Sequence, residues 1–501
     1  MSLAVVYSRA RFGMDAPLVT VEVHLSNGLP SLSIVGLPET AVRESKDRVR
    51  GAILNSHFEF PARRITINLA PADLPKEGGR FDLPIALGIL TANRQIPANE
   101  LDRYEFAGEL ALSGELRPVA GILPLSVQCA RAGRSLVIAD GNADEAALSA
   151  NTHVICCRHL LDVTAHLSGT QRLEEYTRSH HAAGRPSLPD LADVRGQHHA
   201  RRALEIAASG GHSLLLTGPP GTGKSLLASR LPGILPPLSE AEALESATLR
   251  SICGLPLDIA AWRERPFRAP HHTASAVALV GGGSSPRPGE ISLAHHGVLF
   301  LDELPEFDRR VLEALREPLE TGSVVISRAA RQAEFPARFQ LVTAMNPCHC
   351  GHLGDPSGRC RCTSEQVQRY RNRISGPLLD RIDMHVEVPR LSFDDMNRQK
   401  GECSSAVRER VDKTRGIQLG RNGVLSSQLT NRHLDRVCSL EKTDRLLLGT
   451  AMDKLKLSAR AYHRILKLAR TIADMDASDA VGRMHLTEAI AYRNLDRSLR
   501  Q

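Results

Sequence analysis

The first part of the chain combines two periods of hydrophobic and polar positions. Residues 18–25 (LVTVEVHL) alternate apolar and polar side chains, SNGLP follows as a turn, and SLSIVGL continues as a second extended run, which is typical of a β-hairpin. Residues 39–55 instead place their apolar side chains at helical spacing, and 64–70 (RITINLA) alternate as a half-buried strand does. By the same reasoning, a helix over 123–132 and strands over 136–139 and 154–157 complete a mixed α/β domain.

A polar stretch rich in His, Ser, Gly and Pro (SHHAAGRPSLPD) then indicates a linker over 169–189. The pattern that follows is again α/β, and beyond it helical periodicity dominates, as in 446–457 and 462–472. The sequence therefore predicts an α/β protein. We expect its domains at 1–168, 190–390 and 391–501.

A glycine-rich segment after a short apolar strand provides the first candidate chemistry. Residues 213–216 (SLLL) precede GPPGTGKS, and 226–231 continue as a helix, which is the context that the phosphate-binding motif G-x-x-x-x-G-K-[ST] requires. In such a loop the backbone N–H groups surround the phosphates, Lys224 reaches the β- and γ-phosphates, and the Ser225 hydroxyl holds Mg²⁺. The predicted phosphate-binding residues are Gly218, Pro219, Pro220, Gly221, Thr222, Gly223, Lys224 and Ser225.

Two later apolar strands end in polar side chains. The run VLFL is followed by Asp302 and Glu303, and a buried strand of this kind suits the centre of a parallel sheet, whose carboxyl end binds ligands. We expect Asp302 to bind Mg²⁺ through water and Glu303 to polarise the attacking water. The next run, 339–344, ends at Asn346, which either holds that water or is a simple turn residue.

Four cysteines follow directly as two close pairs, Cys348 with Cys350 and Cys360 with Cys362. Four thiolates suit a tetrahedral Zn²⁺ site, although the C-x-C spacing is tighter than the usual C-x₂-C. His349 and His352 are substitute ligands, and unliganded thiols are the alternative. The remaining six of the ten cysteines are scattered.

Composition narrows the class of protein. Lys and Arg number 63 against 56 Asp and Glu, a formal charge of +7, and 42% of residues are hydrophobic, which excludes disorder and fibrous repeats. No apolar stretch is long enough for a membrane span, the first residues lack a signal-peptide pattern, and the cysteines form no disulfide scaffold, so we expect a cytoplasmic protein. The charge makes nucleic acid a plausible partner, but 4% aromatics argue against a base-stacking platform.

The order of the motifs resembles that of AAA+ ATPases. GPPGTGKS, LFLDE, TAMNP and GPLLDRID follow the clade of magnesium-chelatase motors and MCM helicases. The segments VRGQHHARRALEIAASGGHSLLLTGPPGTGKS, RPFRAPHHTAS and SGPLLDRIDMHVEVPR are similar to the magnesium-chelatase-like competence protein family, ComM or YifB, over essentially the whole chain. This resemblance implies a P-loop AAA+ core over 190–390 with a C-terminal α-helical lid over 391–501.

The resemblance also implies roles for single residues. Asn346 resembles the sensor that positions water, and Arg381 resembles an arginine finger presented to the neighbouring subunit, which implies a homohexamer. Arg460 resembles the sensor arginine of the lid, and Arg464, one turn further along the helix, is a competing assignment. Val194, Gly196 and Gln197 resemble the segment that lines the adenine pocket.

Residues 321–344 read as two extended runs joined near Arg328 and Arg331. Their position before the sensor strand resembles the pore hairpin of MCM-like helicases, where the two arginines would contact DNA phosphates. An ordinary exposed hairpin is the alternative. The segment 266–283 resembles the family's second insertion, and its adjacent His271 and His272 are poorly placed to share a metal ion.

The N-terminal domain resembles the proteolytic domain of Lon proteases through FAGELALSGELRPVAG and PKEGGR. Lon uses a Ser/Lys dyad. Here the nucleophile position falls on Arg80, and no lysine stands in the GILPL segment where the base should be. We therefore expect an inactive Lon-like domain over 1–168 and no protease activity.

The resemblance, together with these features, implies a hexameric ATP-dependent DNA helicase or translocase. It would promote branch migration during integration of incoming single-stranded DNA in natural transformation and homologous recombination. Its cofactors would be ATP, Mg²⁺ and structural Zn²⁺, and its partners single-stranded and branched DNA and recombination proteins, with no membrane contact. The alternatives are a metal-chelatase-type motor and an ATP-dependent protein-remodelling machine, neither of which acts on DNA.

Overall fold

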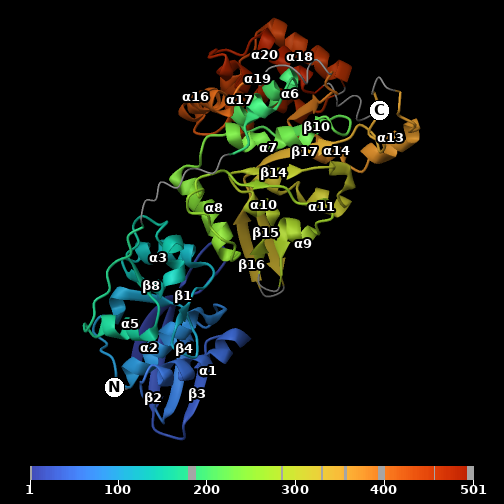
Figure 1. The fold of residues 1–501 in the computed structure, drawn as a ribbon. Coiled ribbons are helices and arrows are strands. Elements are labelled where there is room, and N and C mark those ends of the chain that lie inside the picture. Colours follow the sequence, from blue (N-terminus) through green and yellow to red (C-terminus); the bar gives the residue numbers. More distant parts are fainter. Residues whose placement is uncertain are drawn as a thin grey trace. The chain divides into compact units, whose positions relative to one another are not determined.

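The computed structural model describes residues 3–178, 188–283, 286–328, 331–354, 358–392, 401–455 and 457–493. These residues fall into two compact units that are not continuous in sequence (Figure 1). Unit 1 lies within Met1–Arg185, Glu240–Trp262 and Ala329–Glu334, and unit 2 within Pro186–Ser239, Arg263–Arg328 and Phe335–Gln501. Nine residues of the predicted linker, 179–187, lie outside the described residues.

Unit 1 is built on a four-stranded sheet of order β1-β2-β4-β3. Strand β2 pairs antiparallel with β1 and β4, and β3 runs parallel to β4. The predicted hairpin between β2 and β3 is therefore wrong, although both strands exist. Strand β4 lies between them because Ile65, Ile67 and Leu69 on one face are buried, which suits a central position. The strands are β1 Leu3–Arg9, β2 Leu18–Ser26, β3 Ser31–Val35 and β4 Arg64–Ala70.

Two helices, α1 (Thr40–Asn55) and α2 (Asp82–Ala92), contact each other, and α2 packs on β1 and β2. The predicted helix over 39–55 is confirmed by α1. Helix α2 is buried along its whole length, so it has no amphipathic stripe that would mark it in the sequence. Gly88 allows its close approach to the sheet, since a Cβ there would lie 2.5 Å from Cγ2 of Val23.

A second, parallel sheet of order β5-β8-β9 completes the N-terminal part of unit 1. The predicted helix and strands over 123–132, 136–139 and 154–157 correspond to α3, β8 and β9. The elements are η1 Gly79–Phe81, η2 Leu101–Arg103, β5 Tyr104–Ala107, β6 Glu109–Leu110, β7 Leu116–Arg117, α3 Ile122–Arg131, β8 Ser135–Ala139, η3 Asp140–Asn142, α4 Ala143–Ala146, β9 Val154–Cys157 and α5 Leu160–Leu167.

Helix α8 (Glu240–Ile252) belongs to unit 1, although it follows the P-loop helix in sequence. Its Ala247 packs with Leu123 and Leu148 in a small apolar cluster. The Ser251 carbonyl accepts a hydrogen bond of 3.0 Å from the Gly121 N–H, and its hydroxyl donates one of 2.5 Å to Glu145. Segment 240–262 is therefore an integral part of unit 1.

Unit 2 contains a five-stranded parallel sheet of order β11-β14-β17-β10-β18. The predicted strands at 213–216, 298–301 and 339–344 are confirmed as β10, β14 and β17, within one residue at each end. Strand β17 lies between β14 and β10, so the carboxyl ends of all three meet at one edge. The strands are β10 Leu214–Thr217, β11 Phe267–Arg268, β14 Val298–Leu301, β17 Gln340–Met345 and β18 Met384–Glu387.

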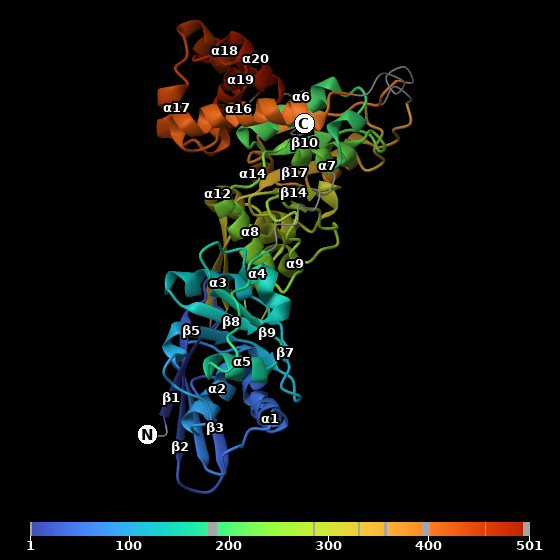
Figure 2. The same ribbon diagram turned by 60° about the vertical axis from the view of Figure 1, so that its left-hand side comes forward.

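The C-terminal helices share one hydrophobic core with this sheet. Phe300 of β14, Val386 of β18 and Ile465 and Leu468 of α19 belong to the same buried cluster. Figure 2 shows α16 to α20 gathered beside α6. These helices are α6 His198–Gly210, α16 Ser404–Asn422, η6 Ser426–Gln428, α17 Asn431–Val437, α18 Lys442–Leu455, α19 Ala459–Met475 and α20 Arg483–Ala491.

Strands β15 (Ser323–Arg328) and β16 (Arg331–Pro336) make the two-stranded sheet that the two extended runs predict. None of the described helices is long and apolar enough to cross a membrane. The remaining elements of unit 2 are η4 Leu191–Asp193, α7 Lys224–Ile234, α9 Ala276–Val280, β12 Gly281–Gly282, β13 Arg287–Pro288, α10 Glu290–Leu293, η5 Leu304–Glu306, α11 Arg309–Ala314, α12 Pro318–Thr321, α13 Ser364–Arg371 and α14 Gly376–Leu379.

A buried ion pair in unit 1 provides a test of its packing. The Glu105 carboxylate, fully buried, accepts hydrogen bonds from Arg9 Nε at 2.6 Å and from Arg134 Nη1 at 3.2 Å. We expect Glu105→Gln to lower the free energy of unfolding by about 3–5 kcal/mol, because Arg9 stays buried without its counter-charge. Urea unfolding measures the change. Asp140→Asn, which removes an exposed pair with Arg158, is the control and is expected to cost under about 1 kcal/mol.

Candidate nucleotide site

The glycine-rich loop lies between β10 and α7, as the motif predicts. Gly221 and Gly223 have positive φ angles of 77° and 89°, which favour glycine. At Gly218 the constraint is space, since a Cβ would lie 2.1 Å from the carbonyl oxygen of Val388 at the end of β18. The loop therefore follows a path that exposes its backbone to a ligand and leaves no room for a side chain at its first position.

The loop borders a cavity of about 400 Å³ that also contains the ends of β14 and β17. Lys224, 8% exposed, donates hydrogen bonds to the carbonyl oxygens of Gly218 (2.8 Å) and Pro219 (2.9 Å) and to Asn346 Oδ1 (3.2 Å). Burial lowers the pKa of Lys224, and the charges of Asp302 and Glu303 oppose that shift. The lining residues are Pro220, Gly221, Thr222, Gly223, Lys224, Ser225, Leu226, Asp302, Glu303, Met345 and Asn346.

The two carboxylates at the end of β14 lie in different surroundings. Asp302 Oδ2 accepts a hydrogen bond of 2.5 Å from the Ser225 hydroxyl, which brings together the two predicted magnesium ligands. Glu303 has a positive φ of 52° and is half exposed, and its backbone N–H donates to Asp302 Oδ1 at 2.9 Å. Its Oε2 lies 3.3 Å from Nδ1 of His272. The two acids therefore have different partners, Ser225 for Asp302 and His272 for Glu303.

The segment predicted to line the adenine pocket lies against the same loop. Val194 is buried, Gly196 has a positive φ of 59°, and Gln197 has one of 49°. The Gln197 side-chain amide donates to the carbonyl oxygens of Pro389 (2.8 Å) and Thr222 (3.4 Å). These bonds join the start of α6, the phosphate-binding loop and the end of β18.

The three candidate arginines differ in their surroundings. Arg381 is 5% exposed, donates to the Pro377 carbonyl at 2.8 Å and pairs with Glu320. Arg464 pairs with buried Asp383. Arg460 is exposed and, among the residues that the structure describes, has no hydrogen bond or ion pair. Of the two competing lid arginines, Arg464 is therefore already engaged in the monomer.

Asp383 is a buried acid that the sequence analysis missed, and it lies at the amino end of β18, at the opposite edge of the sheet from the phosphate-binding loop. Its carboxylate accepts hydrogen bonds from the Ser213 backbone (2.9 Å) and hydroxyl (3.0 Å), and Arg464 provides its counter-charge. Burial alone raises the pKa of Asp383, but Arg464, His212 and the Ser213 backbone bond outweigh it and hold that pKa well below its usual range. The carboxylate joins β18 to the start of β10 and to helix α19. In the sequence it is simply one more acid beside Arg381.

The four cysteines predicted as zinc ligands meet at one point. All four Sγ atoms lie within 4.8 Å of one another. The Sγ atoms of Cys348 and Cys350 are 3.4 Å apart. The Sγ atom of Cys360 lies 3.8 Å from that of Cys348 and 3.7 Å from that of Cys350. Four thiolates about 2.3 Å from a tetrahedral Zn²⁺ would be about 3.8 Å apart, so the cluster fits that ion. The substitute ligands His349 and His352 are not members of this cluster.

Two further sets of predicted residues lie outside this cavity. Arg328 ends β15 and Arg331 begins β16, so they flank residues 329–330, which lie outside the described part of the chain. In unit 1, Arg80 is buried and its Nη2 donates to the Ala120 carbonyl at 2.6 Å. Arg80 stands where the resemblance to Lon predicts the nucleophile, and GILPL where it predicts the base. The two thus lie side by side.

A parallel sheet whose P-loop, acidic strand and polar strand end meet in one cavity defines a P-loop ATPase of the AAA+ type. Three family profiles match the chain: "Magnesium chelatase, subunit ChlI" over 190–396, "Subunit ChlI of Mg-chelatase" over 21–142 and "Magnesium chelatase, subunit ChlI C-terminal" over 401–493. The chain belongs to the magnesium-chelatase-like competence protein family, ComM or YifB.

Individual relatives agree with this assignment. The chain is 52% identical to the competence protein ComM of Haemophilus influenzae, over 100% of this chain and 99% of that protein. It is 51% identical to the YifB protein of Escherichia coli, over 100% and 98%. A more distant similarity, 23% over 42% of this chain and 26% of the relative, is to the zygotic DNA replication licensing factor mcm6-A of Xenopus laevis.

The carboxylate of Asp383 provides a pH-dependent test of the site's support. Asp383→Asn is expected to lower the free energy of unfolding by about 3 kcal/mol at pH 7, because Arg464 loses its buried partner. The folded pKa lies below the unfolded value of about 3.9, so the wild type keeps this advantage above pH 4 and loses it only as the pH falls through the folded pKa. Urea unfolding of both proteins between pH 7 and pH 4 measures the difference in stability, which is expected to stay constant over this range.

Asp435→Asn, an exposed position on the same group of helices, is the control for that test. Arg464→Ala is expected to destabilise the chain in the same direction as Asp383→Asn, whereas Arg460→Ala is expected to leave stability unchanged. Equal stability of the Asp383 and Asp435 variants at pH 7 would contradict the role of the buried ion pair.

Proposed function

We propose that the chain is an ATP-driven DNA motor that promotes branch migration while incoming single-stranded DNA is integrated during transformation and recombination. One observation carries the proposal: Lys224, Ser225, Asp302, Glu303 and Asn346 line a single cavity at one edge of the parallel sheet. The relative named as a competence protein and the distant relative named as a DNA replication licensing factor support DNA as the substrate.

Each side chain has a distinct task in hydrolysis. Ser225 and Asp302, already hydrogen-bonded to each other, hold the magnesium ion, which neutralises phosphate charge when bound. Lys224 exchanges its carbonyl partners for the β- and γ-phosphates. Glu303, which is half exposed, takes the proton of the attacking water, and Asn346 orients that water. Val194, Gly196 and Gln197 hold the base.

In the proposed homohexameric ring, a neighbouring subunit supplies the last cation of the ATP site. Arg381 acts as the finger that stabilises the transition state in a neighbouring subunit of a homohexamer. Within one chain it is paired with Glu320 and largely buried, so it reaches another subunit only after that pair opens. Arg460 acts as the lid sensor, because it is exposed on α19 while Arg464 is held by Asp383.

We assign the domains accordingly: an inactive Lon-like domain over 1–168, a linker over 169–189, an AAA+ core over 190–390 and a helical lid over 391–501. The lack of protease activity is supported by Arg80, a buried arginine at the position where the resemblance to Lon predicts the nucleophile. Arg328 and Arg331, at the ends of the two hairpin strands, contact DNA phosphates in the pore.

Zinc is the proposed structural ion of the cysteine cluster. Cys348, Cys350, Cys360 and Cys362 hold it tetrahedrally and brace the segment that follows Asn346. A backbone hydrogen bond from the His352 N–H, with smaller contributions from neighbouring groups, lowers the pKa of the Cys350 thiol to about 6, which favours the thiolate that a metal requires. The ion supplies no step of hydrolysis.

The motor is tested with a forked or three-stranded DNA substrate. Wild type is expected to hydrolyse ATP and separate the strands. Glu303→Gln is expected to bind ATP but to lose both activities by at least about 100-fold, because the base is removed and the cavity is kept. Absence of DNA binding by wild type at moderate salt would overturn the DNA assignment, leaving the chelatase-type and protein-remodelling motors.

The arginine roles are separated in the same assay. Arg381→Ala alone is expected to lose ATPase activity and to regain part of it when mixed with Lys224→Ala subunits, because each variant then supplies what the other lacks. Arg460→Ala is expected to slow hydrolysis with the fold intact. Failure of the mixture to recover activity would contradict a finger acting between subunits.

The zinc site is tested by metal analysis. Purified wild type is expected to contain about one zinc ion per chain, and Cys360→Ser to contain none and to unfold at a lower temperature, because the metal couples to folding. Cys403→Ser, an exposed cysteine outside the cluster, is the control. Wild type with no zinc and four freely titrating thiols would contradict the site.

A further inference from the structure

A second and larger cavity of unit 2 lies beside the proposed catalytic centre. Its volume is about 1070 Å³, and it is formed by the segment after β11, the start of α11 and helix α13 with the residues that follow it. His272, which lines this cavity, also contacts the Glu303 carboxylate at 3.3 Å. The cavity therefore borders the catalytic carboxylate but contains none of the phosphate-binding loop.

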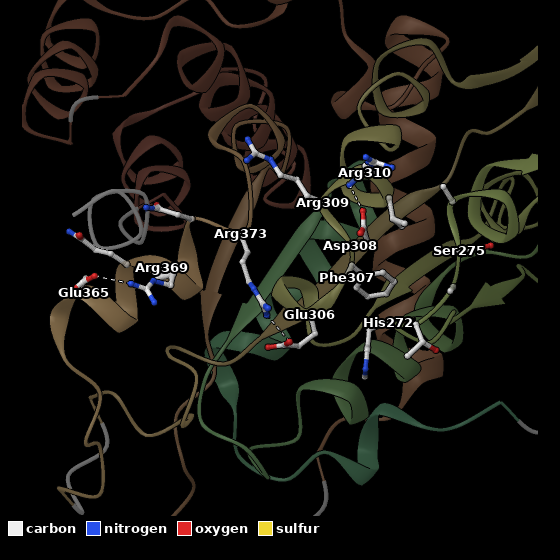
Figure 3. Close-up of a pocket in the computed structure, with 16 residues that line it drawn as sticks. His272, Ser275, Glu306, Phe307, Asp308, Arg309, Arg310, Glu365, Arg369 and Arg373 are labelled. Carbon is white, nitrogen blue, oxygen red and sulfur yellow. Dashed lines mark hydrogen bonds and ion pairs between the residues drawn. The ribbon is translucent and has the colours of Figure 1, made fainter.

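Four arginines dominate its charge. Figure 3 shows Arg309, Arg310, Arg369 and Arg373 around the cavity, with Arg373 pointing to Glu306. The acids of the lining are Glu306, Asp308 and Glu365, so four guanidinium groups face three carboxylates. The cavity is thus cationic by one charge before any contribution from His272.

The carboxylates are already engaged. Glu306 pairs with Arg373 at 2.7 Å and Glu365 with Arg369 at 2.8 Å. Asp308 accepts a hydrogen bond of 2.7 Å from the Arg310 backbone N–H at the start of α11. The guanidinium groups of Arg309 and Arg310 are exposed and have no hydrogen-bond or ion-pair partner among the described residues.

We infer that this cavity binds the phosphate groups of a nucleic-acid strand, an inference that rests on the proposed DNA motor. Guanidinium groups bind phosphate through paired N–H donors, and the two without a partner, Arg309 and Arg310, are adjacent at the start of α11, so they can contact neighbouring phosphates of one strand. The cavity is far larger than one phosphate. Phe307, the phenylalanine that lines the cavity, is only 4% exposed and offers no surface on which a base could stack. We therefore expect the cavity to contact the backbone of the strand.

The test measures binding of a fluorescein-labelled 30-mer of deoxythymidine by anisotropy, from low to moderate salt. The double variant Arg309→Ala, Arg310→Ala is expected to bind about tenfold more weakly than wild type, with a slope of log affinity against log salt smaller by about 1.4, because two phosphate contacts on a single strand are lost. The matched control, Arg432→Ala with Arg445→Ala, removes two exposed charges outside the cavity and is expected to bind as wild type does. Circular dichroism checks that both variants are folded.

The outcomes separate this inference from the proposed function. Equal affinity of wild type and the Arg309, Arg310 variant would overturn the cavity assignment, while strand separation by the wild type would leave the motor standing. No binding by wild type would overturn the motor and the cavity assignment with it. Inorganic phosphate is the second probe, added with saturating Mg-ADP. Phosphate that stabilises wild type and not the variant, without an effect of the oligonucleotide, would assign the cavity to a free anion and overturn the strand.

Discussion

A buried carboxylate can stay charged only if its neighbours satisfy it, and Asp383 of unit 2 is such a carboxylate. Ser213 and Arg464 provide its hydrogen bonds and counter-charge, and the carbonyl oxygen of Ile382 next to it accepts a hydrogen bond from buried Arg493. These partners come from the strand that leads to the P-loop, from α19 and from the end of α20. The requirement for complete pairing therefore sets the position of the C-terminal helices against the nucleotide-binding strand, on which the geometry of the cavity depends.

Local sequence patterns predict most of the strands and most of the residues that line the nucleotide cavity. The strand VLFL and the loop from Gly218 to Ser225 take their conformation from their own residues and not from distant ones. A strand and a loop can therefore be predicted there from the sequence. Pairing is different, because a turn signal reports only neighbours in sequence. The SNGLP turn predicted a hairpin, but Ile65, Ile67 and Leu69 make β4 the better central strand, and it lies between the two. Helix α2 was missed because a fully buried helix has no polar face.

Two side chains outside the cavity lining, one in contact with Glu303 and one that supports strand β10, have no sequence signal of their own. His272 contacts Glu303 only because β11 and β14 are neighbours in the sheet, and Asp383 is buried only because the C-terminal helices cover it. Similarly, the choice between Arg460 and Arg464 depends on which of them finds an acid, and helical spacing places both on one face. The cysteine cluster is the opposite case, since four thiols in two close pairs over fifteen positions have little freedom to lie apart.

The membership of α8 in unit 1 has a consequence for how the chain can be divided. The backbone enters unit 1 again at residue 240 and leaves it at 262, so no single cut separates the two units. A fragment beginning after the linker would keep Leu244, Ala247 and Trp262 but lose Leu123 and Leu148, leaving apolar side chains in water. A fragment produced by proteolysis or gene recombination at residue 185 would therefore expose apolar side chains and be prone to aggregation.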